Sequence, residues 1–105
     1  MVNPTILETA RKYISQIPDD LGLKKVYLFG SYAQGKERVD SDIDIALVLD
    51  NMTNFFSTQM LLMRLRRKID LRIEPHPISE KDFNSMNPLV WEIKKNGIEI
   101  SIEQE

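Results

Sequence analysis

The sequence contains no cysteine, which excludes disulfide bonds and thiolate metal sites. Its apolar runs are all far shorter than the roughly 18 residues needed to span a bilayer. No cationic stretch precedes an apolar run at the N-terminus, as it would in a signal peptide. We therefore expect a cytoplasmic protein that does not enter a membrane. The one histidine, His76, lies between two prolines, where we expect a surface loop and no catalytic role.

Charge of one sign is also not in excess. The chain has 14 lysine and arginine residues against 16 aspartate and glutamate residues, which gives a formal net charge of -2. A protein that binds nucleic acid over a broad surface neutralises many phosphates with basic side chains. The charge balance therefore argues against a nucleic-acid partner. We interpret the basic cluster at 64–68 as a solvated helix end, where the helix dipole favours cations.

The length and the apolar content predict a single domain over residues 1–105. The chain has 105 residues, of which 42% are apolar and 29% charged, enough to close one hydrophobic core. Apolar periodicity predicts helices and strands in alternation. The expected helices span 4–17, a short segment from 31, a segment from 54 to about 68, 79–86 and 88–95. The expected strands span 24–29, 43–49, 69–74 and 98–102, and this order predicts an α/β or α+β fold.

Glycine is scarce, and Gly30 stands between a predicted strand and a predicted helix. A helix start offers unpaired backbone N–H groups and the positive end of the dipole, and both suit a phosphate. Gly30 has no side chain to block a close approach, and Ser31 adds a hydroxyl donor. Strand–glycine–serine–helix segments also occur in proteins without a ligand, so this feature alone predicts little.

Two carboxylates lie two residues apart at the start of the second predicted strand. Asp42 and Asp44 would point to the same face, roughly 6.6 Å apart along the strand. They repel each other unless a cation lies between them, and magnesium is typically bound by one or two carboxylates together with substrate phosphates. The simpler alternative is a solvated strand end in which Asp42 is only a turn residue. The nearby Gly30-Ser31 pair favours the metal.

The third predicted strand supplies another carboxylate, Asp70, which alternates with apolar residues. If the second and third strands are neighbours, one register places Asp42, Asp44 and Asp70 together on the open face of the sheet. Two metal ions about 3.5–4 Å apart could bind there and serve an in-line displacement at phosphorus. Asp70 could instead be an exposed residue paired with Arg72, in which case Glu74 is the alternative third carboxylate.

At this point the sequence resembles a known family. Gly30-Ser31, then ten residues, then Asp42-Ile43-Asp44 is similar to the glycine-serine…Asp-x-Asp signature of the polymerase beta nucleotidyltransferase superfamily. The run GSYAQG…SDIDIALV resembles its minimal nucleotidyltransferase branch, and the resemblance covers nearly the whole chain. The fold that it implies is a small mixed sheet with helices packed on one face and an open active-site face.

The resemblance also implies a reaction and the residues that perform it. The reaction is transfer of a nucleoside monophosphate, usually AMP from ATP, to a hydroxyl with release of pyrophosphate. Gly30 and Ser31 would bind the nucleotide. Asp42, Asp44 and Asp70 would be catalytic and would bind two magnesium ions, with Asp70 also helping to deprotonate the attacking hydroxyl. The metals would neutralise charge at the α-phosphate and lower the pKa of the acceptor hydroxyl.

The resemblance further implies a partner. Many minimal members are encoded beside a HEPN-domain protein, in pairs that resemble toxin–antitoxin systems, and the transferase silences the toxin by adding AMP to a tyrosine. The chain lacks the helical domain with which larger relatives bind an acceptor, so a partner protein is the simplest source of the hydroxyl. A homodimer through the methionine-rich helix at 54–68 is a further expectation.

Two other functions stay open. The acceptor could be a small molecule or an RNA end, or the chain could be a non-catalytic module that neutralises a partner by contact alone. Gln34 keeps the last alternative open, because many relatives carry arginine at this position. If that arginine holds phosphate, Gln34 would weaken the site unless Lys36 or Arg38 takes over.

Overall fold

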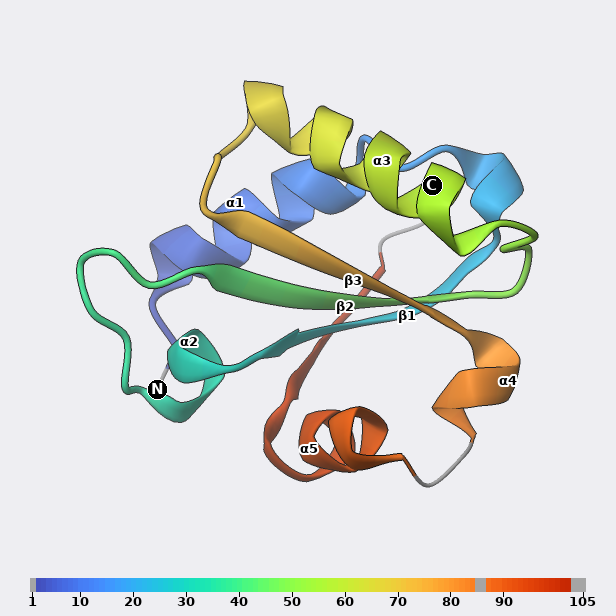
Figure 1. Ribbon diagram of the computed structural model, residues 1–105. Coiled ribbons are helices and arrows are strands. Elements are labelled where there is room, and N and C mark those ends of the chain that lie inside the picture. Colours follow the sequence, from blue (N-terminus) through green and yellow to red (C-terminus); the bar gives the residue numbers. More distant parts are fainter. Residues whose placement is uncertain (1, 85–86, 103–105) are drawn as a thin grey trace.

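The computed structural model describes residues 2–84 and 87–102, which form a sheet with helices on both sides (Figure 1). The strands are β1 (Leu23–Phe29), β2 (Ile43–Leu49), β3 (Ile73–Ser79) and β4 (Ile98–Ile100). They follow the order β3-β2-β1-β4. β1 runs antiparallel to both β2 and β4, whereas β2 and β3 are parallel. The prediction of a mixed sheet in an α/β or α+β fold is confirmed.

The helices begin close to the predicted positions because asparagine residues cap them. They are α1 (Pro4–Ile14), α2 (Ser31–Gln34), α3 (Phe55–Leu65), α4 (Glu80–Phe83) and α5 (Pro88–Asn96), with two 3-10 turns, η1 (Asp19–Leu21) and η2 (Arg66–Lys68). The side chains of Asn3, Asn54 and Asn87 accept backbone N–H groups in the first turns of α1, α3 and α5. Proline at the first position of α1 and α5 adds a suitable backbone angle.

The helix ends differ from the predicted ones by a few residues. α1 ends at Ile14, because the N–H of Ile17 bonds only three residues back, to the carbonyl of Ile14 (3.1 Å), and closes a tight turn ahead of Pro18. α3 continues beyond Leu65 as η2. Residues 85 and 86, at the end of the helix expected over 79–86, lie outside the described residues.

The third strand begins at Ile73, and the prediction that it begins at Ile69 is wrong. The preceding segment forms turns, since the N–H of Asp70 donates to the carbonyl of Arg66 (2.9 Å). The carboxylate of Asp70 also accepts the backbone N–H of Arg72 (2.9 Å). Such local bonds between a side chain and the backbone compete with strand pairing. The alternation of polar and apolar residues at 69–72 therefore does not reflect a strand.

β3 also continues through Pro75 and Pro77, where the sequence predicts its end. Proline cannot donate to a strand ladder, so within sheets it is confined largely to edge strands. β3 is the edge strand beside β2 and therefore tolerates both prolines. As a result, His76 belongs to the sheet and not to a surface loop.

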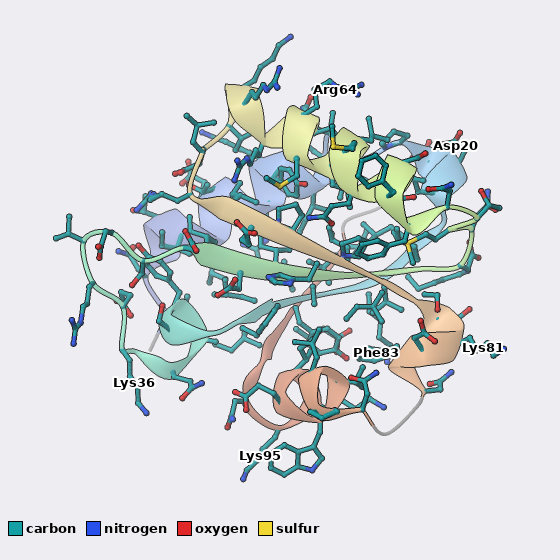
Figure 2. All side chains as sticks on the ribbon, viewed as in Figure 1. Asp20, Lys36, Arg64, Lys81, Phe83 and Lys95 are labelled. Atoms are coloured by element: carbon teal, nitrogen blue, oxygen red, sulfur yellow. The ribbon has the colours of Figure 1, made fainter. Side chains whose placement is uncertain are left out.

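The sheet separates two apolar cores (Figure 1). α1 and α3 cover one face, on which alternate residues of β2 pack with Tyr13 and Leu62. α4 and α5 lie on the other face, where Ala46 and Val48 of β2 pack with Phe83, which projects beside the sheet in Figure 2. Helices were expected on one face only, and this expectation is wrong, because α4 and α5 cover part of the second face.

A buried hydroxyl joins the two helices of the first layer. Tyr13 of α1 is fully buried, and its hydroxyl donates to the carbonyl of Leu62 in α3 (2.7 Å). Burial raises the pKa of the Tyr13 phenol far above its usual range. The neutral phenol therefore connects α1 to α3 through a buried hydrogen bond. In residues 2–84 and 87–102, none of the helices is long and apolar enough to cross a membrane.

Candidate active site

The open end of the second face carries the paired aspartates. Asp44 pairs in register with Phe29 of β1 and with Glu74 of β3. Paired residues of neighbouring strands point to the same face, so Asp44 and Glu74 share this face. Asp42 precedes β2 by one residue and is exposed. The structure therefore gathers acidic side chains at this end of the sheet.

Gly30 brings the start of α2 directly against Asp44. Its φ of 75° and ψ of -152° belong to a conformation that residues with a side chain rarely adopt. A Cβ at this position would collide with the Asp44 carboxylate. α2 begins at Ser31, as the sequence predicts, and ends after one turn at Gly35. The structure thus unites Gly30, Ser31 and Asp44, which the sequence assigns to one site.

Asp70 does not lie on the strand face where the sequence predicts it. It stands in the turn before β3, and its carboxylate accepts the side chain of Arg72 through Nε (3.0 Å) and Nη2 (2.7 Å). These hydrogen bonds lower the pKa of Asp70. The predicted position on the strand face beside Asp42 and Asp44 is wrong, and of the alternative, an exposed strand residue paired with Arg72, only the pairing is confirmed. A metal-binding role for Asp70 stays a prediction.

Sequence reasoning missed His76 as a member of this site. It follows Glu74 by two residues on β3 and so lies on the same face. Its Nε2 is 3.0 Å from Oδ1 of Asp44, and its ring meets that of Phe29 edge-on with centroids 4.8 Å apart. The signal was the polar alternation at residues 72, 74 and 76, which the two prolines obscured. His76 holds one oxygen of the Asp44 carboxylate.

The positive charge near Glu74 comes from Arg66. Its Nη1 lies 3.9 Å from Oε2 of Glu74 and donates to the carbonyls of Leu71 (3.1 Å) and Ile73 (2.9 Å). Within the part of the chain that the structure describes, no three acidic or histidine side chains lie close enough to hold a metal by themselves. Partly exposed carboxylates on one face still suit magnesium, which commonly takes its other ligands from substrate phosphates and water.

Gln34 connects α2 to α5. Its Nε2 donates to Oε2 of Glu92 (3.2 Å), and the same oxygen accepts Nδ2 of Asn96 (2.9 Å). Gln34 is therefore directed toward α5, a contact that the sequence did not suggest. Lys36, considered above as its substitute, extends away from the sheet in Figure 2.

Comparison with known protein families gives one match that covers most of the chain. The family described as Polymerase beta, Nucleotidyltransferase matches residues 11–105. A likeness in fold accompanies it: a crystal structure of a toxin-antitoxin with AMP-PNP superposes with a TM-score of 0.66 and 24% identity, over 93% of this chain and 74% of that chain. At this level of identity the superposition bears on the fold alone.

Curated relatives match shorter or longer parts of the chain. The protein adenylyltransferase MntA of Shewanella oneidensis is 40% identical over 65 residues, which are 57% of this chain and 47% of MntA. A candidate protein adenylyltransferase of Methanocaldococcus jannaschii is 31% identical over 98 residues, which are 90% of this chain and 95% of that protein. The match thus spans about half the length of MntA and nearly all of the archaeal relative.

Proposed function

Because the chain belongs to the polymerase beta nucleotidyltransferase family, we propose that it transfers a nucleoside monophosphate from a nucleoside triphosphate to an acceptor hydroxyl. The contact between Gly30 and Asp44 carries this proposal. It places an open glycine-serine turn, suited to phosphate, against a carboxylate suited to a divalent cation. A phosphate bound at the turn would then lie beside the metal that stabilises charge on it.

The donor set for magnesium is Asp42, Asp44 and a third carboxylate. Glu74 shares the face of Asp44, whereas Asp70 is engaged by Arg72. We assign Glu74 as the third ligand, and Asp70 is the alternative, which would first have to release Arg72. Bound magnesium would supply charge stabilisation at the α-phosphate and a lowered pKa for the attacking hydroxyl.

The chain's own residues would bind and orient the reactants. The backbone N–H groups of the Gly30–Ser31 turn and the Ser31 hydroxyl would donate to the triphosphate. His76 would keep one oxygen of Asp44 in place and leave the other for the metal, since it contacts only Oδ1. Gln34 would hold α2 in position through Glu92.

The proposed nucleotide is ATP, and the proposed acceptor is a tyrosine of a HEPN-domain toxin that this chain silences as an antitoxin. Two findings support this choice. The Shewanella relative is named as a protein adenylyltransferase and the Methanocaldococcus relative as a candidate one, and one structural neighbour is a toxin-antitoxin with AMP-PNP. We also propose that the chain is cytoplasmic.

The test is to incubate the chain with ATP, magnesium and the protein encoded beside it, which this proposal expects to carry a HEPN domain, and to analyse both proteins by mass spectrometry. We expect an AMP adduct on a tyrosine of the partner, and none with the Asp42→Ala, Asp44→Ala double variant. Adducts only on RNA or on a small molecule would redirect the proposal to another acceptor. Neutralisation of the partner by the double variant would show that contact alone suffices.

A further inference from the structure

A second polar network stands at the edge of the proposed site, immediately before β3. Arg72 precedes Ile73, which pairs with Ile43, so Arg72 lies beside Asp42. The backbone confirms this placement, since the carbonyl of Arg72 accepts the N–H of Ile43 (2.8 Å). The backbone of Arg72 therefore lies at the end of the sheet where Asp44 also lies.

Two partners from different elements orient the Arg72 guanidinium. Its Nε and Nη2 donate to the two oxygens of Asp70 (3.0 and 2.7 Å), which is the bidentate geometry of a strong arginine–carboxylate pair. Its Nη1 donates to the hydroxyl of Tyr32 in α2 (3.1 Å). Tyr32 is buried in the core on the α1 and α3 side of the sheet, and it follows by one residue Ser31, which is proposed to donate a hydrogen bond to phosphate. The guanidinium is thus fixed in direct contact with α2.

The fixed guanidinium keeps donors in reserve. A guanidinium carries five N–H donors in a rigid fork. The contacts with Asp70 and Tyr32 engage one N–H on each nitrogen, so one on Nη1 and one on Nη2 are uncommitted among the contacts of the described residues. The side chain is 43% exposed, so a ligand can reach these donors. Arg66, which also lies at this end, is instead committed to the carbonyls of Leu71 and Ile73.

The ion pair is 43% exposed at Arg72 and 18% exposed at Asp70, and its bidentate geometry is the one in which a partly exposed pair contributes to stability. The same contacts orient the guanidinium, and arginine binds phosphate through parallel N–H donors. The carboxylates Asp42, Asp44 and Glu74 at the same end of the sheet repel an anionic nucleotide, and a cation at this end would offset part of that repulsion.

We propose that Arg72 binds the β- or γ-phosphate of the nucleotide, and that Asp70 and Tyr32 are positioning residues that hold its guanidinium toward the phosphates. This inference rests on the proposed nucleotidyltransferase function. It assigns to Asp70 a role that does not require it to bind metal. The ligand class is a nucleoside triphosphate, of which AMP lacks the part that Arg72 contacts.

The experiment compares two ligands by isothermal titration calorimetry: a nonhydrolysable ATP analogue with magnesium, and AMP. For Arg72→Gln we expect affinity for the ATP analogue to fall about 10- to 100-fold, as for loss of a charge-assisted hydrogen-bond pair, with AMP affinity changed less than about twofold. Arg72→Lys should also lose most of the affinity, because a point charge cannot replace the fork. Arg67→Gln, which removes the same charge from an exposed position in η2, is the matched control and should bind as the wild type does.

The positioning residues are tested in the same assay. Asp70→Asn and Tyr32→Phe should each weaken the ATP analogue by about three- to tenfold and leave AMP unchanged. Equal loss of both ligands, or a lowered melting temperature with unchanged binding, would show that the network is only a structural clasp and would overturn the inference. Failure of the wild-type chain to bind the ATP analogue would instead overturn the proposed function itself.

Discussion

At the residue scale, substitutions at Gly30 and Gly35 distinguish the effect of backbone strain from the effect of a collision with Asp44. Both have positive φ, 75° and 69° respectively. A Cβ on Gly30 would meet the Asp44 carboxylate, whereas a Cβ on Gly35 would have nothing within 4 Å. A side chain at Gly35 would thus introduce backbone strain alone. A side chain at Gly30 would introduce strain and would also disturb the contact that brings α2 to Asp44.

We therefore expect Gly30→Ala and Gly35→Ala each to lose about 1–3 kcal/mol of unfolding free energy from strain, and only Gly30→Ala to lose nucleotide binding. Urea unfolding and titration with a nonhydrolysable ATP analogue measure the two quantities. Equal binding by both variants would contradict the role of the Gly30–Asp44 contact.

The third carboxylate gives a second prediction at this scale. Glu74→Gln should lower kcat by about 100-fold or more, because it removes charge stabilisation from the reacting centre. Asp70→Asn should act mainly on KM, since Asp70 contacts Arg72. Steady-state kinetics with varied ATP separates these effects. A larger loss of kcat in Asp70→Asn than in Glu74→Gln would restore Asp70 as the third ligand.

The closeness of Gly30 and Asp44 could be predicted because both lie within one continuous run from the end of β1 to the start of β2. The geometry of that run depends on local structure that the sequence specifies directly. Asp70 was predicted in the wrong position because its sequence is compatible with two backbone conformations. Strand alternation and a turn closed by its own carboxylate both fit the sequence, and only the bonds to Arg72 decide between them.

At the element scale, the hydroxyl of Tyr13 fastens α1 to α3. Tyr13→Phe should lower the unfolding free energy by about 1–3 kcal/mol, because it leaves the buried carbonyl of Leu62 without its donor. Thermal or urea unfolding at neutral pH measures this change. Tyr13→Phe stability equal to that of the wild type would contradict the assigned bond.

The same residue predicts a dependence on alkaline pH. Burial raises the pKa of Tyr13 in the folded state, so the folded chain favours the neutral phenol. Its contribution to stability is therefore complete below the unfolded pKa of about 10 and is lost as pH rises above it. The slope of unfolding free energy against pH above this value should be shallower in Tyr13→Phe than in the wild type.

Gln34 sets the relation between α2 and α5. Gln34→Arg should keep nucleotide transfer within about threefold of the wild type, because arginine can form an exposed ion pair with Glu92, worth on the order of 0–1 kcal/mol. Gln34→Ala, which removes the connection, is the comparison. A rise in transfer of more than about tenfold in Gln34→Arg would show that position 34 acts on phosphate and that glutamine impairs it.

The elements themselves were predicted unevenly. Asparagine and proline mark the starts of α1 and α5 in the sequence, and the structure confirms both. Prolines misled the interpretation of β3, because their effect depends on whether the strand lies at the sheet edge, which is decided by strand order. His76 was not included in the predicted site because β3 was predicted to end before it.

At the scale of the whole molecule, the resemblance to the polymerase beta nucleotidyltransferases is confirmed by the family match over residues 11–105. The covering of the second face by α4 and α5 was not predicted. The sequence of a short helix such as α5 shows which of its residues are apolar. It does not show which face of the sheet those residues will cover. The expected homodimer through α3 stays a prediction. Phe55 and Phe56 of α3 are exposed in the single chain, as such an interface would require.

The central claim is that this chain moves the α-phosphoryl group together with its nucleoside. It is tested most directly by incubating the chain and the proposed HEPN-domain partner with magnesium and ATP labelled either at the α- or at the γ-phosphorus. We predict that α-label appears on the partner, that γ-label is released as pyrophosphate, and that Asp44→Asn abolishes both. Transfer of γ-label to the partner, or no transfer of either label, would contradict the account.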